Sequence, residues 1–166
     1  MKKIFLNSVF IFLLATLIHF LYSTFPSFIT SILAPVNESI FEHLKLIFTA
    51  PILFTFLSNI FYKEKNIFFL AFLRGILNII ILLILYLPIR FIFGEILLIT
   101  LIVLFISILL SETIVSFLPN KKYSLLNFLS IFFIVLTYIL FTYFSYHPPK
   151  NFLFYDTVKD NYGINK

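Results

Sequence analysis

The chain has 166 residues, of which 61% are hydrophobic and only 11% are charged. About 25% of the residues of a typical soluble domain are charged, so this chain lacks the polar surface that a soluble fold needs. Its mean hydropathy of +1.10 instead predicts a membrane protein whose apolar side chains face lipid.

The composition also excludes several classes of function. The chain has no cysteine, which excludes disulfides, thiolate metal sites and cysteine nucleophiles. Its three glycines do not form a phosphate-binding loop or a dinucleotide-binding fingerprint. The net charge of +5 comes mostly from lysines between apolar segments, which leaves no basic surface for nucleic acid.

Five apolar runs follow one another along the chain, each long enough to cross the roughly 30 Å hydrocarbon core as a helix. The runs are continuous and do not alternate with a period of two, which favours helices over a β-barrel. Pro88 is expected to end the third run. The sequence therefore predicts a single-domain, all-α polytopic integral membrane bundle over residues 1–166, with spans at 4–22, 39–62, 67–87, 96–118 and 125–146 and a polar tail at 147–166.

The positive charges between the spans predict the orientation. Cytoplasmic loops of membrane proteins carry an excess of lysine and arginine. We therefore expect a multi-pass protein of the cell membrane with a cytoplasmic N-terminus and an extracytoplasmic tail. Its expected partner is membrane lipid, and a bundle this small is also compatible with a homo-oligomer. The side taken as cytoplasmic carries Lys2, Lys3, Lys63, Lys65, Lys121 and Lys122.

Polar residues concentrate in residues 34–45, just before and within the start of the second span. Glu38 and Glu42 are four residues apart and share a face if both are helical. Ser39 and Glu42 have the spacing of a helix-capping box. The predicted topology places His19 at the same outer level. The candidate catalytic residues are Glu38, Glu42 and His43, and the candidate ligand-binding residues are His19, Asn37 and Lys45.

Histidine and carboxylate side chains together suggest a divalent metal ion as a candidate cofactor, and two histidines with one or two carboxylates suit zinc. The candidate metal ligands are His19, Glu42 and His43. Adjacent residues point about 100° apart on a helix, so Glu42 and His43 need a ligand from elsewhere. The alternative is a set of interfacial residues that face water and lipid headgroups. Further ligands are available in Glu95, His147 and Asp156.

Two charged residues lie inside the third and fourth spans. Arg74 is about seven residues, and Glu112 about six residues, from the inner ends of their spans, so a rise of 1.5 Å per residue places them at similar depths. An unpaired charge at that depth is costly, and pairing lowers the cost. We therefore predict a structural ion pair in the cytoplasmic half, with Asn78 one turn above Arg74. The alternative is that Arg74 extends to the headgroups and Glu112 is protonated.

The sequence P-V-N-E-S-I-F-E-H-L-K at residues 35–45 resembles the P-V-N-E-S-x-[WF]-E-H-L-K signature of a family of small bacterial integral membrane proteins of unknown function. Residues 148–164 are similar to the P-P-x-x-x-L-F-x-D…Y-G-I tail of that family. The resemblance implies a multi-span bundle and carries no established activity.

Three functions remain open from the sequence. The first is a binding or transport-type protein whose outer polar cluster holds a cation or a polar headgroup. The second is a membrane-embedded hydrolase at the outer leaflet that depends on a metal ion or on Glu38 or Glu42 as a base. The third is a structural or accessory subunit in which the polar cluster only joins helices.

Overall fold

The computed structural model describes residues 1–119 and 121–164. Position 120, in the predicted connection before the fifth span, and positions 165 and 166 of the predicted tail lie outside the described residues. The elements are α1 (Lys2–His19), α2 (Leu21–Thr24), α3 (Phe28–Leu33), α4 (Ile40–Tyr62), α5 (Ile67–Phe93), α6 (Leu97–Ser116), α7 (Ser124–Tyr146), β1 (Tyr155–Asp156) and β2 (Asn161–Tyr162).

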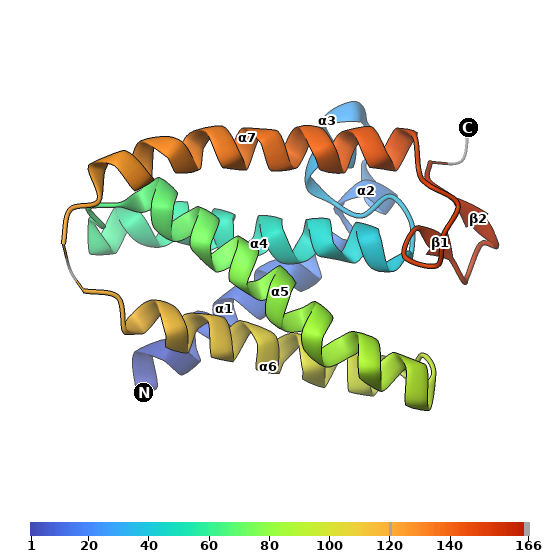
Figure 1. Cartoon of the computed structure of the whole chain (residues 1–166), viewed down its shortest axis with the longest axis horizontal. Coiled ribbons are helices and arrows are strands. Elements are labelled where there is room, and N and C mark those ends of the chain that lie inside the picture. Colours follow the sequence, from blue (N-terminus) through green and yellow to red (C-terminus); the bar gives the residue numbers. More distant parts are fainter. Residues whose placement is uncertain (120, 165–166) are drawn as a thin grey trace.

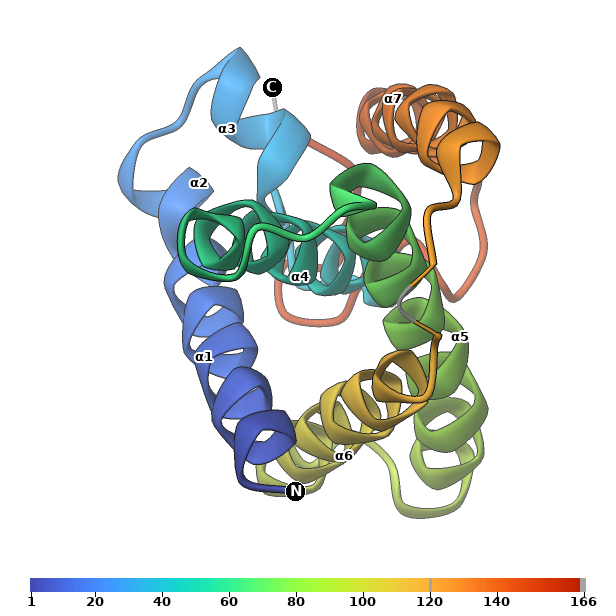
Figure 2. The ribbon, with the colours of Figure 1, turned by 90° about the vertical axis from the view of Figure 1, so that its left-hand side faces the viewer.

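Within the described ranges, five helical segments are long and apolar enough to cross a membrane, with α1 and α2 forming one of them. The predicted all-α bundle is therefore confirmed. Helices α1, α4, α5 and α6 surround a common centre, and α7 lies outside this group against α5 (Figure 2). Helix α4 is the most buried, with 61% of its most apolar stretch buried against 11% for α7.

The third predicted span ends too early. Helix α5 continues through Pro88 to Phe93, and the predicted end at Leu87 is wrong. Proline removes one backbone donor, but the neighbouring amides in an apolar environment have no water to replace their helical bonds, so the helix continues. It ends at Gly94, whose φ of +74° suits a residue without a side chain.

The two ends of the bundle differ in chemistry (Figure 1). One end gathers the N-terminus and the α4–α5 and α6–α7 connections, which carry the six lysines that predicted the cytoplasmic side. The other end gathers the segment between α1 and α4, the α5–α6 turn and the β1–β2 hairpin. The polar segment of residues 34–45 and the tail therefore lie at the same end.

The tail folds back onto the start of α4. Phe41 donates its backbone N–H to the carbonyl of Leu153 at 2.9 Å, and Ile164 donates to the carbonyl of Ser145 at 3.2 Å. Gly163 has a φ of +66°, and a Cβ there would lie only 2.8 Å from the Ser145 carbonyl oxygen. A glycine at this position therefore allows the tail to approach the end of α7 closely.

Candidate metal centre

Two of the predicted site residues, Glu42 and Lys45, form an internal ion pair. Their charged atoms are 2.7 Å apart, and the side chains are only 2% and 0% exposed. The Lys45 ammonium also donates to the Ser31 carbonyl at 2.7 Å and to Ser145 Oγ at 2.8 Å. The Glu42 carboxylate accepts from Val36 N–H at 3.1 Å and from Ser145 Oγ at 2.5 Å. This arrangement joins α4 to α3 and α7.

The predicted capping box forms only in part. Ser39 Oγ accepts from the Glu42 N–H at 3.4 Å, as a helix cap does. The reciprocal contact is replaced because the Glu42 carboxylate turns to Lys45, and the Ser39 N–H donates to Asn37 Oδ1 at 2.9 Å. The Asn37 amide nitrogen donates to the Gly163 carbonyl at 3.0 Å. Asn37 therefore fixes the loop and the tail.

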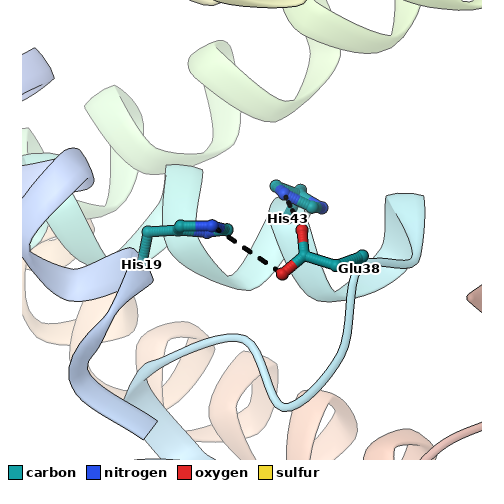
Figure 3. Close-up of side chains that lie close together, drawn as sticks. All are labelled: His19, Glu38 and His43. Carbon is teal, nitrogen blue, oxygen red and sulfur yellow. Dashed lines mark ion pairs between the residues drawn. The ribbon is translucent and has the colours of Figure 1, made fainter. Parts of the chain in front are cut away.

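Glu38 and His43 belong to the same segment, and their side chains lie close to His19 at the end of α1 (Figure 3). The Nε2 atoms of His19 and His43 lie 3.8 and 3.5 Å from the two oxygens of the Glu38 carboxylate. The imidazole rings stack with centroids 5.4 Å apart. The ligand atoms of all three residues lie within 4.8 Å of one another, in a half-exposed position.

The backbone around the cluster orients two of its side chains. His43 Nδ1 lies 2.9 Å from the Ser39 carbonyl, which can only accept, so Nδ1 carries a proton and Nε2 is the ring nitrogen that faces Glu38. Hydrogen bonds of this kind commonly orient metal-binding histidines. The buried Asp156 carboxylate accepts from the Glu38 N–H at 3.1 Å. The tail therefore positions the backbone of the central carboxylate.

The other proposed ligands do not join the cluster. Glu95 pairs with Arg90 at 3.1 Å, and both oxygens of Asp156 accept from backbone N–H groups. The exposed His147 packs against Tyr143. Glu42 also lies apart, and Glu38 takes the place between the histidines that the sequence suggested for Glu42.

The predicted partners Arg74 and Glu112 are in contact in the other half of the bundle, with 2.7 Å between Arg74 Nε and Glu112 Oε1. Arg74 Nη1 also donates to Thr55 Oγ1 at 3.0 Å, and Asn7 Nδ2 donates to Glu112 Oε2 at 3.1 Å. Asn78 lies one turn further along, and its Nδ2 donates to the Arg74 carbonyl at 3.0 Å. Four helices therefore meet at this ion pair.

A pocket of about 300 Å³ adjoins the cluster between α4, α5 and α6. Glu38 and His43 line the pocket, and Tyr86, Arg90 and Glu95 also contribute to its wall. Neither Tyr86 nor the pocket is predictable from the sequence, because no spacing along the chain relates the end of α5 and the start of α6 to the segment before α4.

Five apolar segments and a polar cluster at one end define a small multi-pass helical membrane protein. The chain belongs to a family of unknown function, DUF6512, whose model matches residues 1–164. The predicted membership of a family without an assigned function is therefore confirmed. No curated protein and no solved structure shows significant similarity to the chain.

Proposed function

We propose that this membrane protein binds a divalent transition-metal ion, with zinc the best match, through His19, Glu38 and His43 on the extracytoplasmic side of the cell membrane. The observation that carries the proposal is the convergence of two imidazole Nε2 atoms on one carboxylate, at 3.8 and 3.5 Å. Ligands about 2.0–2.2 Å from a tetrahedral zinc ion lie roughly 3.3–3.6 Å apart. Small side-chain movements therefore suffice to place an ion among them.

The different contacts made by the polar residues within positions 35–45 support this assignment. Asn37, Ser39, Glu42 and Lys45 make contacts that hold the loop, the tail and α7 together. Glu38 and His43 instead direct their side chains at His19. The polar heads of Glu38 and His43 therefore remain available for a ligand, whereas those of Glu42 and Lys45 stabilise the fold.

Metal analysis tests the proposal directly. Protein purified through a histidine-free tag and dialysed against zinc should retain about one ion per chain. His43→Gln and Glu38→Gln should each weaken zinc binding at least tenfold, because three ligands are reduced to two. Equilibrium dialysis with elemental analysis measures both quantities.

Two matched variants serve as controls. His147→Gln removes an exposed histidine outside the cluster, and Glu64→Gln removes a carboxylate in the α4–α5 connection. Both should bind zinc as the parent does. Equal zinc retention by His43→Gln and His147→Gln contradicts the assignment, and so does a parent protein that binds none of zinc, cobalt, manganese or copper.

The proposed orientation has its own test, which the absence of native cysteine makes simple. Ser23→Cys and Ser124→Cys are nearly isosteric, leave every charge in place, and lie exposed at opposite ends of the bundle. In intact cells, a membrane-impermeant maleimide should label only Ser23→Cys, and Ser124→Cys should react only after lysis. The reverse pattern would invert the topology and place the metal site on the cytoplasmic side.

A metal-dependent hydrolase acting at the outer leaflet is a second candidate, favoured by the three-ligand set and the adjoining pocket. Three protein ligands leave a zinc position open for water, and zinc makes bound water a nucleophile near neutral pH. Lipid turnover by the zinc-loaded parent but not by His43→Gln would separate an enzyme from a binding protein. A folded protein without metal would favour a structural or accessory role.

A further inference from the structure

The lining of the pocket beside the cluster changes from polar to apolar along the helix axes. Its polar groups, which include Glu38, His43, Arg90 and Glu95, lie at the outer ends of the helices or in the loops beyond them. One to two turns further into the bundle, the lining is apolar and includes Leu46, Leu82 and Leu104. A ligand that fills this pocket therefore needs a polar end near the helix ends and an apolar end that extends into the bundle.

The charges at the polar end favour an anionic group. Arg90 and Glu95 balance each other in an ion pair at 3.1 Å. The two positive charges of a divalent ion among His19, Glu38 and His43 exceed the single negative charge of Glu38. The polar end of the pocket is then positive. An oxygen anion is a suitable ligand for the open position of such an ion.

The position and size of the pocket fit an amphiphile from the bilayer. A volume of about 300 Å³ is at the lower end of the range for small-molecule pockets, so it suits one hydrocarbon chain better than a bulky ligand. The lining includes Leu97, the first residue of α6, which is 73% exposed. The pocket therefore has an exposed apolar residue at its polar end, past which a hydrocarbon tail can enter.

We propose that the pocket between α4, α5 and α6 holds the hydrocarbon chain of an anionic amphiphile whose headgroup oxygen binds the ion at His19, Glu38 and His43. This inference rests on the proposed metal site and names its ligand class. It accounts for the placement of Glu38 and His43 in the wall of a pocket whose inner lining is apolar.

Native mass spectrometry of the whole protein in detergent tests the inference, because it reports zinc and ligand on the same molecule. The probe is dodecyl phosphate, with inorganic phosphate and dodecanol as its separate halves. The zinc-loaded parent should bind one dodecyl phosphate at least tenfold more tightly than either half. Removal of zinc with a chelator should weaken that binding at least tenfold.

A matched pair of variants tests whether the hydrocarbon chain of the ligand lies in this pocket. Thr100 lines the pocket and Thr137 lies on α7 away from it, and each hydroxyl bonds to the carbonyl four residues earlier. Thr100→Phe should retain zinc but lose dodecyl phosphate binding at least tenfold, whereas Thr137→Phe should retain both. Unchanged binding in zinc-loaded Thr100→Phe, or equal binding of inorganic phosphate, overturns the inference and leaves the metal site standing. A parent without zinc overturns the metal site and this inference together.

A fluorescence measurement keeps the test decisive if Thr100→Phe does not fold. The chain has no tryptophan, so Leu97→Trp introduces a single indole at the exposed edge of the pocket. Dodecyl phosphate brominated on its chain should quench this indole more strongly with zinc than without. Leu125→Trp, exposed at the start of α7, should show the same quenching in both states. Zinc-independent quenching at both positions contradicts the inference.

Discussion

Replacing Lys45 with methionine should lower the free energy of unfolding by about 3–5 kcal/mol, the usual cost of removing one partner from a buried ion pair. Methionine keeps most of the volume of the lysine stem, so packing changes little. The Glu42 carboxylate, whose side chain is 2% exposed, then keeps the Val36 N–H and the Ser145 hydroxyl as its partners among the described residues. Thermal or denaturant unfolding in detergent, followed by circular dichroism, measures the loss.

A double variant separates charge burial from packing. Glu42→Gln alone should also be strongly destabilising, because it leaves the Lys45 ammonium buried without its carboxylate. Glu42→Gln with Lys45→Met removes both charges and should cost clearly less than the two single losses combined. Lys150→Met, at an exposed position in the tail, is the control and should change stability little. Strict additivity of the two core substitutions would show that the ion pair does not couple them.

This network explains why the sequence predicted the polar segment but not the arrangement of its members. Residue types and spacing placed Glu42, His43 and Lys45 near the start of a helix. Which carboxylate faces inward depends on partners more than a hundred residues away, such as Ser145 on α7. No local pattern links Glu42 to that hydroxyl. A prediction from the segment alone therefore could not assign Glu42 to the interior and Glu38 to the histidines.

The contacts that the tail makes with the polar segment also could not be predicted from local sequence patterns. Asp156 was considered as a metal ligand because of its residue type, but its carboxylate receives backbone N–H groups and positions Glu38. The meeting of His19 with His43, in contrast, followed from the topology. Two successive spans in opposite directions bring the end of the first and the start of the second to one side of the membrane. Hydrophobic patterning therefore predicts the level of a residue well and its orientation poorly.

The second large loss of stability is expected on substitution of Arg74 or Glu112. Their pairing was predicted from their similar depth in the membrane. Both lie on regular helices, so the rise per residue fixes their levels and the hairpin of α5 and α6 brings them together. Arg74→Leu leaves the Glu112 carboxylate with Asn7 as its hydrogen-bond donor, and Glu112→Leu leaves the guanidinium with Thr55. Each single variant should lose about 3–5 kcal/mol of unfolding free energy.

The double variant Arg74→Leu with Glu112→Leu should be more stable than either single variant, because neither charge of this pair remains buried without its partner. Its residual cost is that of the Asn7 amide and the Thr55 hydroxyl, which each lose one hydrogen bond worth about 1 kcal/mol. The matched control is the more exposed pair of Arg90 and Glu95, where Glu95→Gln should cost less than about 1 kcal/mol.

Unfolding in detergent, measured on all four proteins, distinguishes this account from the alternative in which each charge is accommodated separately. A double variant whose loss equals the sum of the two single losses would show that the two charges are not coupled, and it would favour a protonated Glu112 with Arg74 reaching the headgroups. Retention of zinc by the double variant is expected as well. The ion pair lies in the opposite half of the bundle from His19, Glu38 and His43, and the two regions share no side chain.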